Sequence, residues 1–264
     1  KTVVVKYGGN AMTDVELQKS FALDVVLLKL VGINPIVVHG GGPQIDAALK
    51  EEEIASEFIG GFRVTTPEIF EVVERVLVNE VGPDVVNSLR RAGVNAVALS
   101  GRTSECLIAE PLRKLVDGSP VDLGLVGGIT AVNPQAINSA LKGGQVPVIS
   151  PIATDENFKG GLNVNADLAA AAIAGALSAE SLIIMTDVAG IYRDWPDTSS
   201  LISSISYAEL DAMKATFAEG MAPKVQAALD ALSFGAKAVR IIDGTDPDSF
   251  ASALAGKGGT LVVA

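Results

Sequence analysis

Short runs of β-branched and apolar residues alternate with longer amphipathic stretches along nearly the whole chain of 264 residues. Strands are predicted at residues 2–5, 35–38, 96–99, 146–149, 182–185, 238–242 and 260–263, and helices at 13–31, 42–53, 66–92, 134–141, 166–177, 222–234 and near 247–254. Strands that are apolar throughout and separated by helices are typical of a parallel sheet covered on both faces. We therefore expect an α/β fold, a three-layer αβα sandwich with a mostly parallel central sheet.

Two details qualify this pattern. The helical stretch 66–92 is expected to be interrupted at Gly82 and Pro83, and residues 155–163 to form a loop. No repeat or flexible linker divides the chain, so two lobes, residues 1–174 and 175–264, would share a continuous sheet with a boundary near Gly175. Ligands of such folds bind beyond the carboxyl ends of the strands, which directs attention to the loops there.

Charge and hydropathy exclude several classes of function. The formal net charge is −11, and a surface of this sign repels the phosphate backbone of nucleic acids. The longest fully apolar run, residues 168–177, is shorter than the roughly 20 residues of a membrane span, and the chain opens without a signal-peptide pattern. One cysteine, Cys106, allows no internal disulfide. We expect a cytoplasmic protein that binds neither nucleic acid nor membrane.

Two predicted strands end in glycine turns, Lys6-Tyr7-Gly8-Gly9-Asn10 and His39-Gly40-Gly41-Gly42-Pro43. Glycine allows a tight turn whose N–H groups approach an anion closely, and the second turn leads into a helix N-terminus. Neither turn matches a P-loop or a dinucleotide fingerprint. Each could be a plain sheet turn, but Lys6 at the end of an apolar strand favours function over the alternative of a lysine that reaches solvent.

Polar residues follow several other predicted strands. Arg63 lies beyond a double glycine, where its planar fork suits a carboxylate, although a surface arginine is the simpler interpretation. Asn163 and Asp167 flank Asn165, which could simply be the N-cap of the next helix. Lys224 is in the first turn of another helix, where a lysine opposes the helix dipole, and this costly placement indicates a role.

The remaining polar groups support no other chemistry. The single histidine, His39, is interpreted as structural, Cys106 as a packing residue, and Trp195 and Pro196 as local loop packing. With one His and one Cys, a Ser/His/Asp triad, Cys/His catalysis and a protein-held metal site are all poorly supported.

Taken together, the segments 6–12, 39–44, 61–66, 163–167, 186–192 and 220–225 resemble the amino acid kinase family, in this order and nearly from end to end. The resemblance implies that ATP phosphorylates the γ-carboxylate of N-acetyl-L-glutamate, giving an acyl phosphate and ADP in arginine biosynthesis, with Mg²⁺ arriving on the nucleotide. A carboxylate is already ionised at pH 7 and needs no general base, so positioning and charge neutralisation would suffice.

The resemblance also implies residue roles. Lys6 and Lys224 would neutralise the transferring phosphoryl group, Asp167 would orient both lysines, and Gly8, Gly9 and Gly41 would bind the phosphoryl group through their N–H groups. The substrate would be held by Gly41, Gly42, Arg63 and Asn163, in a lobe of residues 1–174 that also dimerises. The ATP site, in residues 175–264, would include Thr186, Asp187, Gly190, Tyr192, Met221 and part of the stretch before Met221, together with Gly8.

Alternatives stay open at this point. A sibling kinase of the same fold could act on carrier-bound aminoadipate, aspartate, glutamate or carbamate; a silent binding module and a nucleotide-dependent oxidoreductase are less compatible with the residues. Arginine-inhibited members carry an extra N-terminal helix that builds a hexamer, whereas this sequence opens on its first strand and has a shortened glycine stretch at 256–260. We therefore expect a homodimer, with a higher homo-oligomer, arginine as effector and a nitrogen-regulatory protein as further possibilities.

Overall fold

The central sheet follows from the alternation of the sequence. The computed structural model describes residues 1–157, 160–218 and 220–264. Within them, eight strands pair in the order β12-β14-β13-β11-β1-β2-β8-β5, and every neighbouring pair is parallel except β13 with β14. The strands are β1 (Thr2–Tyr7), β2 (Asn34–His39), β5 (Ala96–Ser100), β8 (Val146–Ser150), β11 (Ser181–Thr186), β12 (Ser204–Ser206), β13 (Ala238–Asp243) and β14 (Thr260–Val263). The mostly parallel sheet is confirmed.

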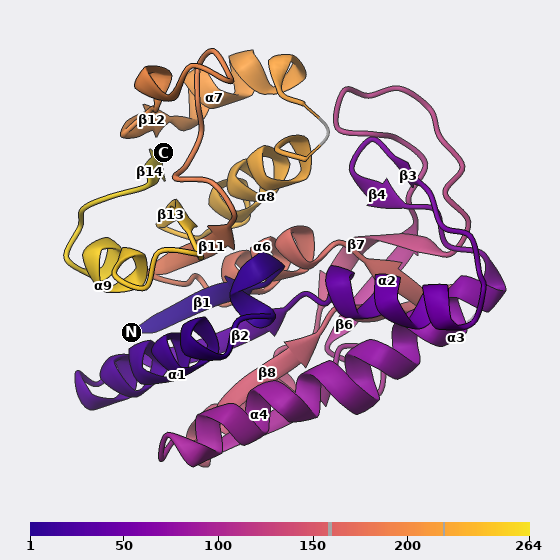
Figure 1. Ribbon diagram of the computed structural model, residues 1–264, viewed down its shortest axis with the longest axis horizontal. Helices are drawn as coiled ribbons and strands as arrows, with labels where there is room; N and C mark the ends of the chain where they lie inside the picture. Colours follow the sequence, from indigo (N-terminus) through magenta and orange to yellow (C-terminus); the bar gives the residue numbers. More distant parts are fainter. Residues whose placement is uncertain (158–159, 219) are drawn as a thin grey trace.

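Helices cover both faces of this sheet (Figure 1). Alternate residues of a strand face opposite sides: Val3 and Val5 of β1 belong to a core shared with Phe21, whereas Val4 belongs to a second core with Ala170. The three-layer sandwich is therefore confirmed. The helices are α1 (Val15–Leu30), α2 (Gly42–Glu51), α3 (Pro67–Arg75), α4 (Gly82–Arg91), α5 (Gln135–Lys142), α6 (Ala166–Ala176), α7 (Tyr207–Met213), α8 (Ala222–Ser233) and α9 (Ser249–Leu254), with short 3₁₀ turns η1 (Gly9–Met12), η3 (Thr198–Ser200) and η4 (Lys214–Thr216).

Two smaller sheets lie beside the main one. Four strands close on themselves in the order β10-β7-β6-β9, and β3 pairs with β4 as a hairpin. Their bounds are β3 (Phe58–Ile59), β4 (Phe62–Arg63), β6 (Leu107–Pro111), β7 (Val126–Val132), β9 (Ile152–Asp155) and β10 (Gly161–Val164). This four-stranded sheet supplies Asn163 to the site described below, because β10 ends just before α6.

Two local predictions are wrong. The helical stretch does not break at Gly82 and Pro83: α3 continues through a π-helical segment, η2 (Val76–Val81), into α4 with helical backbone angles at both junctions. A proline lacks an N–H and crowds the carbonyl one turn before it, and a wider π turn at this point accommodates Pro83. The expected loop 155–163 is also wrong at both ends, because Asp155 belongs to β9 and Gly161 begins β10; residues 158 and 159 of that loop lie outside the described residues.

Among the described residues, no helix combines the length and the apolar character that crossing a bilayer requires.

Candidate active site

The two glycine turns lie side by side. β1 and β2 are adjacent parallel strands, and Tyr7 pairs with His39 at their carboxyl ends. The Gly40 N–H donates to the Tyr7 carbonyl at 2.7 Å. A Cβ atom on Gly8 would lie 3.7 Å from the Cα of Gly40 and 2.9 Å from the Lys6 Nζ. Because these glycines have no side chains, the two turns and the Lys6 ammonium group can lie in direct contact.

Lys6 and Lys224 meet on one carboxylate. The Lys6 Nζ lies 3.2 Å from Asp167 Oδ1, and the Lys224 Nζ donates to Asp167 Oδ2 at 3.0 Å. The three residues come from the end of β1 and the first turns of α6 and α8. Asn165 caps α6 by accepting from the N–H groups of Asp167 and Leu168, so the simple interpretation of Asn165 is confirmed.

This cluster is buried. The Asp167 and Lys6 side chains are 4% and 9% exposed, and Lys224 is 17% exposed. Burial lowers the pKa of Lys6, an effect that Asp167 opposes and Lys224 reinforces. For Asp167, burial would raise the pKa, but attraction by Lys224 and Lys6 outweighs it and the pKa is lowered. The carboxylate is thus ionised and holds two ammonium groups in a water-poor region.

The first glycine turn is held from a neighbouring strand. Asp187, directly after β11, accepts the Asn10 N–H at 3.0 Å. Gly9 has a φ of +69°, and a Cβ there would lie 2.7 Å from Asp187 Oδ1. Glycine is therefore required at position 9 by both conformation and space. The structure places Asp187 against this turn, next to the Lys6 cluster.

All four predicted substrate residues line one cavity. Gly41, Gly42, Arg63 and Asn163 surround a cavity of about 160 Å³ together with Leu77 and Asn165. A Cβ on Gly41 would come within 2.5 Å of Leu77 Cδ2, so only glycine fits there without movement. The structure thus brings together four residues that are spread over more than a hundred positions of the sequence, and their binding of substrate stays a prediction.

Arg63 is buried and already engaged. Its Nη2 lies 2.8 Å from Asp46 Oδ1, its Nη1 donates to the Ser56 hydroxyl at 2.7 Å, and its guanidinium lies 4.6 Å from the centre of the Phe58 ring. Asp46 is 59% exposed. Nearby, Asn163 donates to Thr65 Oγ1 at 3.1 Å, and Thr65 donates to the Arg63 carbonyl. A buried guanidinium with an exposed carboxylate partner is suited to exchanging that partner for an incoming carboxylate.

The predicted nucleotide residues are more dispersed. Thr186 ends β11 and is buried, and Met221 precedes α8, three residues before Lys224. Gly190 packs against Thr260, whose hydroxyl accepts the Ile191 N–H, so packing alone requires glycine there. The Tyr192 ring lies 5.1 Å from Trp195. Residue 219, in the stretch before Met221, lies outside the described residues.

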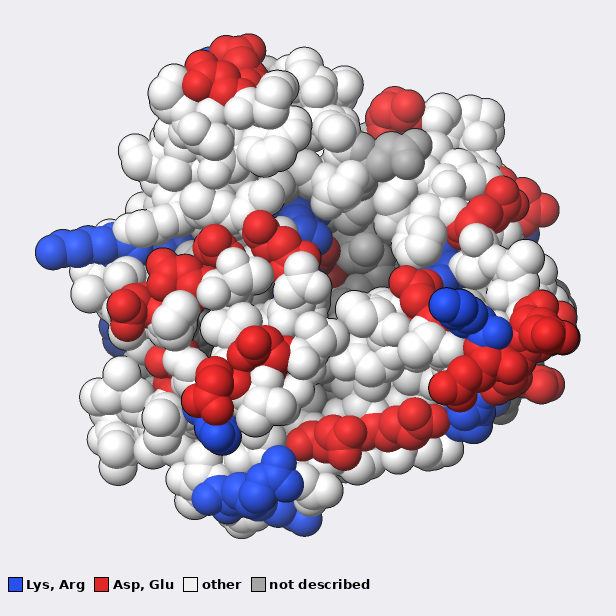
Figure 2. Space-filling view, viewed as in Figure 1, with Lys and Arg blue, Asp and Glu red and all other residues white. Residues whose placement is uncertain are grey.

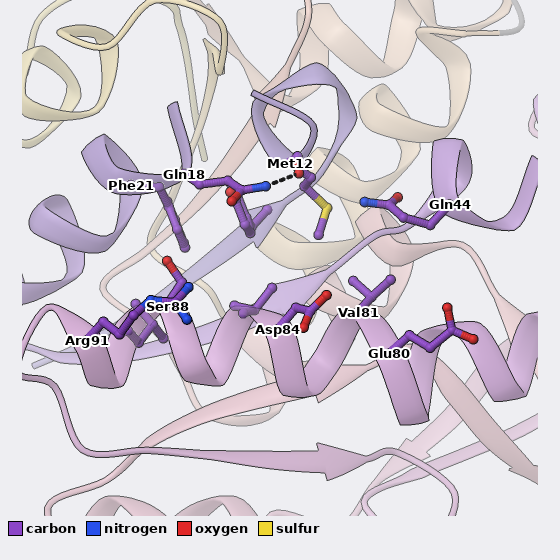
Figure 3. Close-up of a pocket in the computed structure, with 12 residues that line it drawn as sticks. Met12, Gln18, Phe21, Gln44, Glu80, Val81, Asp84, Ser88 and Arg91 are labelled. Carbon is purple, nitrogen blue, oxygen red and sulfur yellow. Dashed lines mark hydrogen bonds between the residues drawn. The ribbon is translucent and has the colours of Figure 1, made fainter. Parts of the chain in front are cut away.

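A larger cavity of about 360 Å³ contains none of these side chains. It lies between α1 and α4, behind the glycine turns, and Figure 3 shows Asp84 and Val81 of the long helix facing Met12 and Gln44. Two further cavities, of about 1180 and 520 Å³, are larger still and also contain none of them. The residues with the chemistry instead surround the smaller one.

The residues interpreted as structural occupy structural positions. His39 and Cys106 are completely buried, and burial lowers the pKa of His39 to about 4. Trp195 contacts Tyr192 within its own loop. On the face seen in Figure 2, acidic side chains are spread widely with basic side chains in smaller groups between them, which contrasts with the buried pair of lysines.

Several residues of the site carried no sequence signal. Asp46, Ser56 and Thr65 hold Arg63 and Asn163, and Ser150 contacts His39. An exposed aspartate on a helix and hydroxyl residues in loops are common everywhere. Their role becomes visible only when the folded structure shows which distant residue each of them contacts.

Comparisons with known proteins show the family to which the chain belongs. The model of the amino acid kinase family matches residues 1–243. Acetylglutamate kinase of Corynebacterium urealyticum is 47% identical over 261 residues, covering 98% of this chain and 85% of that protein, and acetylglutamate kinase of Cutibacterium acnes is 51% identical over 249 residues, covering 92% and 80%. Among solved structures, carbamate kinase of Giardia superposes with a TM-score of 0.70 at 20% identity, covering 100% of this chain and 98% of that one.

The N-acetylglutamate synthase of Neisseria gonorrhoeae, solved with coenzyme A and N-acetyl-glutamate, superposes with a TM-score of 0.83 at 24% identity, over all of this chain and 59% of that one. At that identity the likeness concerns the fold. The chain belongs to the amino acid kinase family. It is an enzyme, a kinase that transfers a phosphoryl group.

Proposed function

We infer that the protein is an acetylglutamate kinase, which transfers the γ-phosphoryl group of ATP to the γ-carboxylate of N-acetyl-L-glutamate and yields N-acetyl-L-glutamyl 5-phosphate and ADP. The observation that carries this inference is the buried cluster of Lys6, Asp167 and Lys224 beside a cavity that contains every predicted substrate residue. Relatives of that name at 47–51% identity support it.

The chemistry needs charge neutralisation more than acid–base catalysis. A substrate carboxylate oxygen attacks the γ-phosphorus while the bond from that phosphorus to the β,γ-bridging oxygen breaks, and ADP leaves with the electron pair. Both reactants are anions at pH 7. We propose that Lys6 and Lys224 offset their charge, since ammonium groups in a buried region act more strongly than they would in water. Asp167 holds both ammonium groups in place before substrates arrive.

Backbone N–H groups complete the phosphoryl site in this proposal. Gly8, Gly9 and Gly41 belong to the two adjacent turns, and a Cβ atom at these positions would lie 2.9, 2.7 and 2.5 Å from a neighbouring side-chain atom. Arg63 binds the α-carboxylate of the substrate by exchanging Asp46 for it, while Gly42 and Asn163 contact the rest of the molecule. Charge-assisted pairing with a planar guanidinium fixes the substrate's orientation as well as its affinity.

For the nucleotide, we propose binding by Thr186, Asp187, Gly190, Tyr192 and Met221, in a lobe formed by residues 175–264, with residues 1–174 forming the substrate and dimerisation lobe. Mg²⁺ would arrive with ATP. In the described residues, no three His, Cys, Asp or Glu side chains are grouped as metal ligands, and we propose that the nucleotide phosphates hold the ion.

In its biological setting, we propose a cytoplasmic homodimer in arginine biosynthesis. Light scattering of the purified protein measures the oligomer, and a thermal shift with and without arginine tests whether arginine binds. A higher oligomer, or a nitrogen-regulatory protein that co-elutes, would replace the simple dimer.

The activity is tested by ADP release from MgATP in the presence of N-acetyl-L-glutamate, compared with glutamate, aspartate, aminoadipate and carbamate. We expect stimulation by N-acetyl-L-glutamate well above the others, and trapping of the acyl phosphate by hydroxylamine as a hydroxamate. Greater stimulation by another acid would identify a sibling kinase instead. No stimulation by any acid would point to a protein that binds without turnover.

A further inference from the structure

The buried histidine has hydrogen-bond partners on both ring nitrogens. His39 Nδ1 lies 2.8 Å from the Gly40 carbonyl oxygen, and Nε2 lies 2.7 Å from Ser150 Oγ. The Ser150 hydroxyl is in turn 3.1 Å from the Leu77 carbonyl oxygen. A chain of three contacts thus runs from the second glycine turn to the π-helical segment η2.

The number of available protons limits which of these three contacts can be hydrogen bonds. Burial lowers the pKa of His39 to about 4, so the imidazole is neutral at pH 7 and carries one N–H. With the Ser150 hydroxyl, two protons are available for three contacts, and one contact must stay without a proton. Either the Gly40 carbonyl receives Nδ1–H, or the Leu77 carbonyl receives the serine proton through the alternative tautomer.

The backbone hydrogen bonds of the two carbonyl groups distinguish between these two tautomers of His39. The Leu77 carbonyl already accepts the N–H of Gly82, so it remains paired without Ser150. In the described part of the chain, nothing except His39 donates to the Gly40 carbonyl. Without a proton on Nδ1, its lone pair would face the Gly40 carbonyl oxygen at 2.8 Å, which costs more than leaving a second lone pair of the Leu77 carbonyl unused. The favoured state therefore has Nδ1–H donating to Gly40 and the Ser150 hydroxyl donating to Nε2.

We propose that His39 is a positioning residue that holds the Gly40–Gly41 peptide plane and thereby aims the Gly41 N–H at the reacting anion. The Gly40–Gly41 peptide is trans, and in a planar trans peptide the carbonyl and the next N–H point in opposite directions. His39 lies below the turn and does not line the substrate cavity, whereas Gly40 and Gly41 do. Fixing the carbonyl toward His39 therefore turns the N–H toward the cavity.

Packing supports the same assignment. The Leu77 side chain of η2 packs against Gly41, and a Cβ on Gly82 would lie 3.2–3.3 Å from the Leu77 carbonyl, His39 Nε2 and Ser150 Oγ. The π-helical segment thus brings the Leu77 side chain onto one face of the turn while leaving room for the ring beneath it. The effect of His39 on catalysis rests on the proposed function, whereas its tautomer does not depend on that function.

The first test is the tautomer, measured by ¹⁵N NMR of protein labelled at histidine. The chain contains a single histidine, so one pair of ring resonances reports the site without assignment. We expect a protonated Nδ1 and an unprotonated Nε2, unchanged from pH 8 to pH 5. A protonated Nε2, or averaging between the two, overturns the proposal whether or not the kinase activity is confirmed.

The second test compares His39→Asn with His39→Gln. An asparagine amide can place a donor near the position of Nδ1, whereas a glutamine amide reaches toward Ser150 instead. We expect kcat to fall about tenfold in His39→Gln, the equivalent of one lost hydrogen bond, with KM for both substrates little changed, and to recover partly in His39→Asn. Ser150→Ala should lower kcat less than His39→Gln does.

Equal losses in both His39 variants, or a loss in Ser150→Ala as large as that in His39→Gln, would make the cluster a packing unit and overturn the proposal. If these variants do not fold, the NMR result on the unmodified protein decides. If the unmodified protein has no kinase activity at all, the proposed function fails while the tautomer remains measurable, so the two failures are distinguishable.

Discussion

Two clusters of the same composition lie at opposite ends of the central sheet. At the carboxyl ends of the strands, Asp167 bridges Lys6 and Lys224 at 3.2 and 3.0 Å. At the amino ends, Glu180 bridges Lys1 and Lys237 at 3.1 and 2.9 Å. The distances are nearly the same, so distance does not separate them.

Burial separates them. The Asp167 side chain is 4% exposed, whereas Lys1 and Lys237 are 69% and 64% exposed. Water and salt screen the exposed cluster, and such pairs contribute little to stability. The buried cluster is not screened, and it places two ammonium groups where an anion could use them. An acid that joins two lysines is therefore a functional signal only where the fold excludes water.

Removal of the shared acid should have the largest effect. In Asp167→Asn, two buried ammonium groups lose their counter-charge, and breaking a buried pair from one side costs about 3–5 kcal/mol of folding stability. We expect a clear drop in the urea midpoint together with the loss of kinase activity. Equilibrium urea unfolding followed by circular dichroism measures the first, and ADP release the second.

The matched control is Glu180→Gln, which removes the shared acid of the exposed cluster. Its urea midpoint and its kcat should stay at those of the unmodified protein. If the two variants lose similar stability, the contrast between the two ends of the sheet disappears, and burial is not what distinguishes them.

Replacing the lysines of the two clusters by alanine should have the next largest effect. In Lys6→Ala or Lys224→Ala, kcat should fall by roughly 10²-fold or more, equivalent to about 3 kcal/mol of transition-state stabilisation. Lys1→Ala and Lys237→Ala provide controls that remove the same charge from the other cluster and should leave kcat unchanged. Near-normal turnover in Lys6→Ala or Lys224→Ala would remove these lysines from the chemistry.

The two lysines of the buried cluster were accessible from sequence because each violated a local preference, whereas Asp167 is an ordinary first-turn acid of α6 whose role only the family resemblance implied. Lys6 ends an apolar strand, and Lys224 opposes a helix dipole. The main sheet was equally accessible, since its long apolar strands alternate with helices. Gly41 and Gly42 were found through the turn that follows β2, which the parallel pairing with β1 brings beside Gly8 and Gly9.

Other features depend on contacts that no local pattern encodes. The sheet of β6, β7, β9 and β10 consists of short strands without an apolar run, so periodicity missed most of it. Pro83 was expected to end a helix, but the π turn before it depends on tertiary packing. Asp46 and Ser150 are ordinary residues in sequence, and their contacts with Arg63 and His39 arise only when distant elements meet.

Salt should produce the smallest and most selective effect. The Debye length falls from about 10 Å at 0.1 M to about 3 Å at 1 M salt, so added salt weakens exposed pairs and leaves buried ones nearly intact. We expect any difference in Tm between Glu180→Gln and the unmodified protein to be near the resolution of a thermal scan at low salt and absent at 1 M NaCl. The deficit of Asp167→Asn should persist at both concentrations. Because each variant is compared with the unmodified protein in the same buffer, general effects of salt on stability cancel. If salt removed the Asp167→Asn deficit as well, water and ions would have access to the cluster, and its two lysines would resemble those of the exposed end.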